Sequence, residues 1–353
     1  GDERGPTLRL AAADLLAAVS TREDLKMARD WIRLEDIEEH YPQIAAAAMI
    51  LGRHGSPAVD ETALIAAMEH MHSGAYSAHL YHPPKRRLVD SLAGLLAHDN
   101  PAHVARLMKR YEQEVAKKGD RKESVIEALY WALCKSAGPE ARALLEENQR
   151  LALPFYEYLK RVDPNHLRGF YERWRDGAGS GELRLDDRPT LFAAIADFGQ
   201  REDAYRLYNL AASGWDRPLD VEEISYAAQA AAKLIARTGA YALVRDDVAG
   251  GLRESLKPNG GLYKRVITAI EVAGEAGSAE DLAALEAILR VNPADVAFVH
   301  EMSQHEAAHS WAKLIHRLGL FEQSMPLIQS MLADRNAIVN KAAFEALRLQ
   351  VLK

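Results

Sequence analysis

The chain contains a single cysteine, Cys134, so no disulfide can form within it. Cys134 follows an apolar run, 128–133, and we expect its thiol to be buried in a core rather than reactive. No apolar stretch approaches the roughly 20 residues that a membrane-spanning helix requires, so no membrane span is expected. We expect a cytoplasmic protein. A removed signal peptide is the alternative, because the sequence begins at Gly1 rather than at a methionine.

Aromatic residues make up only 7% of the chain, and alternating runs of Val, Ile and Thr are few. Strands therefore have little support. Alanine, leucine, glutamate and arginine, which are all strong helix formers, are abundant instead. The net charge of −7 offers no general attraction for nucleic acid. The composition thus predicts an all-helical protein and argues against a nucleic-acid partner.

Amphipathic segments follow one another along the chain, separated by short clusters of Gly, Pro, Asn and Asp. Pro101 and Pro139 stand at expected helix starts, and Gly239, Gly277 and Gly319 stand just past expected helix ends, where a left-handed backbone is expected. Twenty helices are predicted. Among them are separate helices at 22–39, 42–53, 294–302 and 305–318.

One spacing of residues recurs. It runs from Asp334 through Val339 to Leu347, and again from Asp120 through Val125 to Leu133. A looser copy aligns 305–314 with 340–349, so that His305 matches Asn340. The spacing resembles the second helix of a HEAT repeat, with Asn340 standing where that family usually has arginine, and the likeness is clearest over 278–353.

The resemblance implies an all-α fold: an α-solenoid of stacked antiparallel helix pairs forming a right-handed superhelix. One helix pair cannot bury its apolar face alone, so neighbouring pairs must stack. A Gly-rich loop at 176–188 is predicted between an N-terminal helical-repeat half, 1–175, and a C-terminal HEAT-like half, 189–353. One continuous domain is the alternative. The expected core of the last repeat includes Val339, Ala343, Ala346 and Leu347.

The sequence His305-Glu306-Ala307-Ala308-His309 matches the HExxH motif of zinc metalloproteases. In that family two histidines one helical turn apart bind zinc, and the glutamate is the general base. A repeat helix is the favoured interpretation, because the same residues align with the repeat spacing. A helical wheel then places Trp311 in the buried stripe, His305, His309 and His316 along its flank, and Glu306 toward solvent. A third ligand is not where the family has it, since Glu345 is two predicted helices away.

A second metal alternative depends on two His-Glu pairs, His300-Glu301 and His305-Glu306. They are similar to the pairs that hold the di-iron site of deoxyhypusine hydroxylase, a HEAT-repeat family. The N-terminal half has only reversed pairs, Glu39-His40 and Glu69-His70, which departs from that pattern. We therefore expect no cofactor, with zinc or iron at His300, His305 and His309 as the alternative.

Three other segments carry candidate chemistry. The histidines at 70, 72, 79 and 82 cross an expected helix end, and we expect them to be surface or capping residues. Residues 83–122 are locally basic but interrupted by acidic residues, so a solvated surface is favoured over a phosphate-binding one. The middle of the chain is rich in residue types that are enriched at interface hot spots. The candidates for partner binding there are Arg168, Tyr171, Arg173, Trp174 and Arg175.

We expect a non-catalytic scaffold whose concave helical face binds a protein or peptide partner. This is an inference from architecture, because fold alone does not imply function. One alternative is a metal-dependent enzyme with Glu306 as its catalytic base and His305 and His309 as ligands. Another is a nucleic-acid-associated helical repeat that uses residues 83–122.

Overall fold

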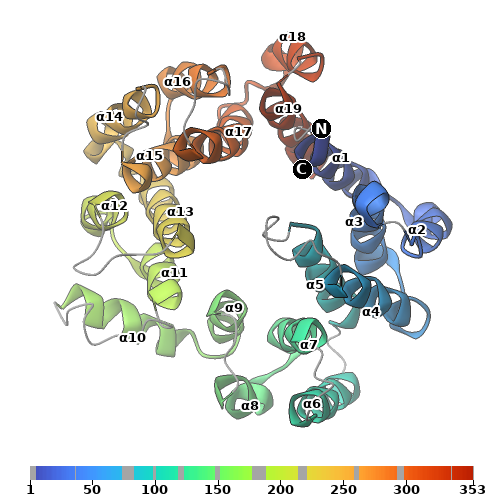
Figure 1. Ribbon diagram of the computed structural model, residues 1–353. Coiled ribbons are helices and arrows are strands. Elements are labelled where there is room, and N and C mark those ends of the chain that lie inside the picture. Colours follow the sequence, from blue (N-terminus) through green and yellow to red (C-terminus); the bar gives the residue numbers. More distant parts are fainter. Residues whose placement is uncertain are drawn as a thin grey trace. The chain divides into compact units, whose positions relative to one another are not determined.

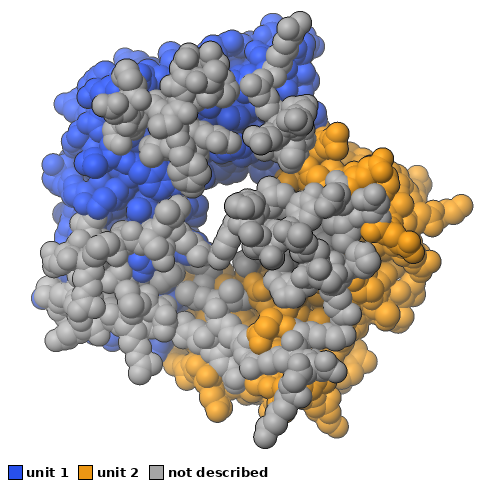
Figure 2. Space-filling view, in the orientation of Figure 1, with its two compact units in different colours: residues 1–8, 164–353 blue, residues 9–163 orange. Residues whose placement is uncertain are grey.

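The computed structural model describes residues 5–35, 37–73, 83–97, 101–117, 123–147, 152–176, 188–213, 221–257, 262–291, 298–334 and 336–352. These residues form helices joined by turns and contain no strand, so the all-α prediction is confirmed for them. The chain divides into two compact units, one of residues 9–163 and one of residues 164–353 with 1–8 (Figure 2). The predicted loop at 176–188 lies almost wholly outside the described residues, and the predicted domain boundary stays a prediction.

The helices of the first unit begin with α1, whose residues from Arg9 onward belong to it. They are α1 (Gly5–Val19), η1 (Arg22–Asp24), α2 (Leu25–Trp31), α3 (Ile37–His54), α4 (Pro57–Ser73), α5 (Pro83–Leu96), α6 (Pro101–Ala116), α7 (Glu123–Ser136), η3 (Pro139–Ala141), α8 (Arg142–Glu147) and α9 (Ala152–Val162).

The second unit begins at Pro164. Its helices are α10 (Pro164–Arg175), α11 (Arg188–Phe198), α12 (Asp203–Ser213), α13 (Val221–Thr238), η5 (Tyr241–Leu243), α14 (Arg245–Ser255), α15 (Tyr263–Ala276), α16 (Ala279–Leu289), α17 (Phe298–Arg317), α18 (Phe321–Leu332) and α19 (Ala337–Val351).

Helices of the unit 164–353 pack in two rows (Figure 1). The odd-numbered helices α11, α13, α15, α17 and α19 each contact the next odd helix, and we call them the odd row. Each even-numbered helix packs against the odd helix that follows it, and these form the even row. In the unit 9–163, α3, α5, α7 and α9 contact one another in the same order, with α2, α4 and α6 beside them.

Small residues allow neighbouring odd-row helices to approach closely. A Cβ added to Gly274 of α15 would lie 2.8 Å from the Cα of Ser310 on α17. A Cβ added to Gly52 of α3 would lie 2.7 Å from the Cα of Ser91 on α5. Both distances are shorter than packed carbon atoms tolerate, so glycine is needed at both helix crossings. Much of the chain's alanine is likewise buried along these helices.

An arginine near the end of an odd-numbered helix repeatedly binds the end of the preceding odd-numbered helix. Its guanidinium donates hydrogen bonds to backbone carbonyls of the last turn, which have no partner within their own helix. A positive charge also interacts favourably with the negative end of the helix dipole. The four bonds are Arg53 to Ala18, Arg161 to Ala137, Arg237 to Ala196 and Arg317 to Gly277.

An aspartate at the start of an even-numbered helix forms a second recurring contact. Its carboxylate accepts a hydrogen bond from a backbone N–H at the turn that leads into the helix, and so caps that helix. The same carboxylate accepts a hydrogen bond from a side chain earlier in the chain. The donor–acceptor pairs are Arg29 and Asp60, Tyr171 and Asp203, and Tyr241 and Asp281.

The odd-row helices of the unit 164–353 end at regularly placed glycines. Gly199, Gly239, Gly277 and Gly319 follow α11, α13, α15 and α17 at intervals of 40, 38 and 42 residues. Gly239 and Gly319 have φ angles of 63° and 68°, in the left-handed region that glycine adopts without strain. The sequence correctly places Gly239, Gly277 and Gly319 past helix ends, but Gly277 has a φ of −66°, so the left-handed backbone expected there is wrong.

Two predicted helix boundaries are wrong. Residues 22–39 do not form one helix, because α2 ends at Trp31 and α3 begins at Ile37, with Pro42 inside it. The predicted break between 302 and 305 does not exist either, since α17 runs unbroken from Phe298 to Arg317. Ser303 and Gln304, at the predicted break, are both buried inside this helix.

One buried amide recurs near the predicted repeat alignment of α17 with α19. The side-chain amide of Gln304 in α17 donates to the carbonyls of Ile288 and Val291, at the end of α16. The amide of Asn340 in α19 donates to Met331 and Asp334 at the end of α18. Gln304, one residue before the predicted match of Asn340 with His305, therefore makes the contact equivalent to that of Asn340, while the burial of 306–311 follows that of 341–346 in the predicted alignment.

Predicted core positions are confirmed with one exception. Val339, Ala343 and Ala346 are buried, whereas Leu347 is only half-buried. Cys134 is buried, with 3% of its surface exposed, as expected of a core thiol. None of the helices that the structure describes combines the length and apolar character required to cross a bilayer.

Candidate functional site

The residues that the sequence singles out on α17 lie on the side of the odd row that faces away from the even row. Trp311 marks the opposite side, because its indole N–H donates to Glu286 of α16 at 3.2 Å. At 100° per residue, His305, Glu306, His309 and Lys313 are turned roughly 120–160° away from Trp311. We call this side of α13, α15, α17 and α19 the free face.

Glu306 is half-buried and lies near Glu271 of α15, so its predicted place toward solvent is wrong. Glu271 is 2% exposed. Burial and the neighbouring charge of Glu306 raise the pKa of Glu271 to about 8. The protonated form of Glu271 is therefore favoured in the folded protein. Tyr263, at the start of α15, lies near Glu306, and burial raises its pKa to about 12.

His309 and Glu345 come together across α17 and α19, although the sequence places them 36 residues apart. Nδ1 of His309 lies 3.6 Å from Oε2 of Glu345, which also accepts a hydrogen bond of 2.8 Å from Arg348. Burial alone would raise the pKa of Glu345, but the His309 and Arg348 side chains outweigh it and hold the pKa at about 2. Glu345 is thus an ionised carboxylate neutralised by two neighbours.

His305 has a different environment from His309. Nζ of Lys341 on α19 lies 3.4 Å from Nδ1 of His305. Burial and this ammonium lower the pKa of His305 to about 4, so the imidazole is neutral at pH 7. Its ring accepts a hydrogen bond from Lys341 rather than facing a carboxylate.

These contacts bear on the zinc alternative. His305, His309 and Glu345 are the residue types of a zinc site, and the structure brings Glu345 closer than the sequence suggested. A positive charge nevertheless adjoins two of the three, with Lys341 at His305 and Arg348 at Glu345. No group of three or more His, Cys, Asp or Glu side chains converges on a metal position within the part of the chain that the structure describes. The side chains of His300 and Glu301 lie outside that part.

The five partner-binding candidates on α10 separate into two kinds. Tyr171 and Trp174 are buried, and Tyr171 donates to the capping carboxylate of Asp203 at 2.8 Å. The guanidinium of Arg206 on α12 stacks 4.2 Å from the centre of the Trp174 ring. Both aromatic residues therefore hold α10 against α12. The exposed candidates are Arg168, Arg173 and Arg175.

The basic segment 83–122 is largely neutralised where it is described. Arg87 pairs with Asp14 at 2.5 Å, and Lys117 pairs with Glu114 at 2.7 Å. Arg110 pairs with Glu61 of α4. These ion pairs leave less positive charge for phosphate than the sequence alone indicates. The side chains at 69–86 and all of 118–122 lie outside the described residues, which includes the histidines at 70, 72, 79 and 82.

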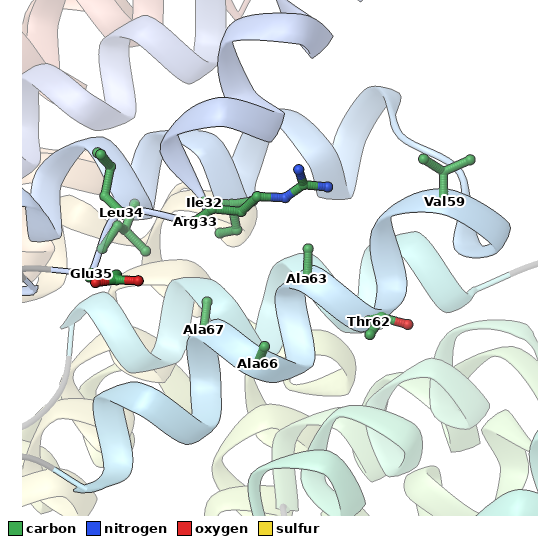
Figure 3. A pocket seen from close by; sticks show the side chains of 10 residues that line it. Ile32, Arg33, Leu34, Glu35, Val59, Thr62, Ala63, Ala66 and Ala67 are labelled. Carbon is green, nitrogen blue, oxygen red and sulfur yellow. The ribbon is translucent and has the colours of Figure 1, made fainter.

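A pocket of about 340 Å³ lies in the other unit, between the end of α2 and α4. Ala63, Ala66 and Ala67 of α4 point toward the segment 32–35, whose Arg33 side chain extends over them (Figure 3). The lining is mainly aliphatic and contains no histidine, cysteine or serine. None of the site residues predicted from the sequence lines this pocket, whose only ionisable or hydroxyl side chains are Arg33, Glu35 and Thr62.

Sequence reasoning missed four charged residues on α17 and its neighbours. They are Glu271 and Glu275 of α15, Lys313 of α17 and Lys341 of α19. Their place follows only from the packing of α15 and α19 on α17. A weak signal was present, because Glu271 lies in a run of apolar residues, 266–274, that is otherwise typical of a buried helix. Comparisons with protein-family models, curated protein sequences and solved structures found no match to this chain.

Proposed function

We propose that this chain is a HEAT-like helical repeat scaffold that binds a protein or peptide partner along the free face of the unit 164–353. The observation that carries the proposal is the row of odd helices, which the even row covers on one side while the other side presents polar side chains. Glycine spacings of 38–42 residues are close to the length of about 40–47 residues of HEAT and armadillo repeats. Recurring arginine and aspartate contacts support a repeated unit. In such arrays an extended surface commonly holds the partner.

A scaffold explains the side chains of the free face better than catalysis does. Lys233 pairs with Asp197, and Lys313 pairs with Glu275, each across two neighbouring odd helices. Such pairs hold helices in register and leave charged groups exposed to a ligand. An enzyme would instead need a general base beside a nucleophile or metal. Glu306, the base of the zinc alternative, lies near the buried carboxyl of Glu271.

The test is a selection of random linear peptides displayed on phage, followed by affinity measurement. One variant carries Gln229→Lys and Lys233→Glu, at exposed positions of the free face on α13. Its matched control carries Gln323→Lys and Arg253→Glu, at exposed positions of the even row, and has the same net charge. We expect the free-face variant to lose at least tenfold in affinity, about 1.4 kcal/mol, and the control to bind as the wild type does. Failure to select any binding peptide, or equal loss in both variants, contradicts the proposal.

A further inference from the structure

The pocket between the end of α2 and α4 carries two opposite charges. Arg33 and Glu35 both line it, and both are exposed. Among the residues that the structure describes, neither side chain forms a hydrogen bond or an ion pair, with the other or with a third group. Arg29, one turn earlier, pairs instead with Asp60 of α4 at 2.8 Å. Both charges at the pocket are therefore available to a group from outside the chain.

The wall between these charges is aliphatic. Side chains of methyl size on α4 leave the space open, and two buried isoleucines close it on the side of α2 and α3. Apart from the hydroxyl of Thr62, this wall offers no side-chain hydrogen bond, so the body of a ligand that fits it has to be apolar. The residues of the wall are Ile32, Ile44, Ala63, Ala66 and Ala67.

The two charges lie toward different ends of the pocket. The Arg33 side chain extends over Ala63, whereas Glu35 lies toward Ala67 (Figure 3). Ala63 and Ala67 are about one helical turn apart on α4, roughly 6 Å along its axis. One ligand that reaches both charges therefore needs an anionic group and a cationic group separated by an apolar body.

The volume of the pocket limits the length of that body. Its 340 Å³ corresponds to about eleven atoms other than hydrogen, if each takes roughly the 30 Å³ that a molecule occupies in liquid water. An unbranched chain with a carboxylate at one end and an ammonium at the other, 8-aminooctanoate, has about that number of such atoms. It also has no polar group between its ends that the aliphatic wall would leave without a partner.

We infer that this pocket binds an aliphatic ω-amino acid, with the carboxylate of the ligand on Arg33 and its ammonium on Glu35. The guanidinium presents N–H donors in a planar fork that matches a carboxylate, and an ammonium donates up to three hydrogen bonds to carboxylate oxygens. The methylene chain packs against the alanines of α4. The site lies in the unit 9–163 and does not depend on the proposed function, which concerns the unit 164–353.

The experiment follows alanine methyl groups by NMR in the full chain labelled with carbon-13 at alanine Cβ. Ala63→Ser and Ala66→Ser identify the two signals that report on the pocket. The probes are 8-aminooctanoate, octanoate, which lacks the ammonium, and octylamine, which lacks the carboxylate, each up to roughly 20 mM. We expect a dissociation constant in the low millimolar range for the amino acid, the order expected of so small a ligand. Octanoate and octylamine should each bind at least about threefold more weakly, because each loses one ion pair.

Two variants assign the charges. Arg33→Gln should bind 8-aminooctanoate no better than octylamine, and Glu35→Gln should bind it no better than octanoate, because each variant lacks the partner of one ligand charge. The matched controls are Arg22→Gln and Glu23→Gln, at exposed positions of η1 outside the pocket, and both should bind as the wild type does. Unshifted alanine methyls at 20 mM, equal affinity for the three probes, or full affinity for the amino acid in Arg33→Gln would overturn the inference.

Discussion

Replacing Gly274 with alanine tests the close contact between α15 and α17. The new Cβ would lie 2.7 Å from the Cβ, 2.8 Å from the Cα and 2.8 Å from the Oγ of Ser310. Ordinary carbon contacts begin at roughly 3.5 Å, so the two helices must separate by more than half an ångström. Ser310 Cα belongs to the backbone and cannot rotate away. Overpacking of this kind typically costs about 1–3 kcal/mol.

Gly169→Ala is the matched control, because both glycines lie inside helices of the same compact unit. Only Nη1 of Arg173, the mobile end of a long side chain, lies near the added Cβ of residue 169, at 3.8 Å. Alanine at a free helical position stabilises by about 1 kcal/mol relative to glycine. The same gain at Gly274 is outweighed by the overpacking. We therefore expect Gly274→Ala to destabilise the unit by about 1–2 kcal/mol and Gly169→Ala to stabilise it by up to about 1 kcal/mol.

The assay is urea unfolding followed by far-ultraviolet circular dichroism, with both variants compared with the wild type in one buffer. The slope of the transition must be unchanged for the midpoints to report stability. A third variant, Gly274→Ala with Ser310→Gly, removes the contacts to Cβ and Oγ but keeps the one to Cα, so it should recover part of the loss. Gly274→Ala as stable as Gly169→Ala would refute the close approach of α15 and α17.

Four further outcomes are expected. Ala343→Arg places a charge at a position that is 0% exposed. It should lower the free energy of unfolding by several kcal/mol, roughly the scale of burying an unpaired charge in a packed core. An unchanged melting temperature would contradict this prediction. Folding favours the ionised form of Glu345, so its contribution to the free energy of unfolding is present above about pH 4.5. That contribution is lost as the pH falls toward 2, at about 1.4 kcal/mol per pH unit. In urea titrations, the difference in stability between the wild type and Glu345→Gln should therefore narrow over that interval. Folding favours the protonated form of Glu271, so the wild type should lose stability relative to Glu271→Gln as the pH rises from about 4.5 to 8, and parallel stability curves would argue against a buried acid there. Glu306→Gln should leave partner binding within about threefold of the wild type at neutral pH. A zinc-dependent peptidase activity lost in this variant, together with stoichiometric metal by elemental analysis, would instead establish the enzyme alternative.

The HExxH match illustrates how a local pattern and its surroundings differ in meaning. Two histidines four residues apart lie on one side of a helix in any fold, and this much follows from the sequence. Whether they meet a carboxylate or an ammonium depends on the neighbouring helices. His309 meets Glu345, while His305 meets Lys341 from the same helix α19. The same holds for Tyr171 and Trp174. Their residue types are typical of interfaces, but their side chains are buried between α10 and α12.

The sequence by itself determined the all-helical class and the glycines that end helices. It also determined the buried Cys134 and most core positions of the last repeat. These features depend on local propensity and on the spacing of apolar residues, which neighbours along the chain specify. Its error at 303–304 arose where tertiary contacts, such as the buried amide of Gln304, place polar residues inside a helix.

Only the tertiary structure decided which charged residues meet. Glu271 and Glu306 are 35 positions apart, and Arg237 and Ala196 are 41 apart. Their contacts depend on the register between helices of the odd row, which small residues such as Gly274 set through close packing. A one-residue change in that register rotates a side chain by about 100° and changes its partner. Local patterns can place these residues on a helix surface, but packing between helices alone makes Glu271 a buried, protonated acid.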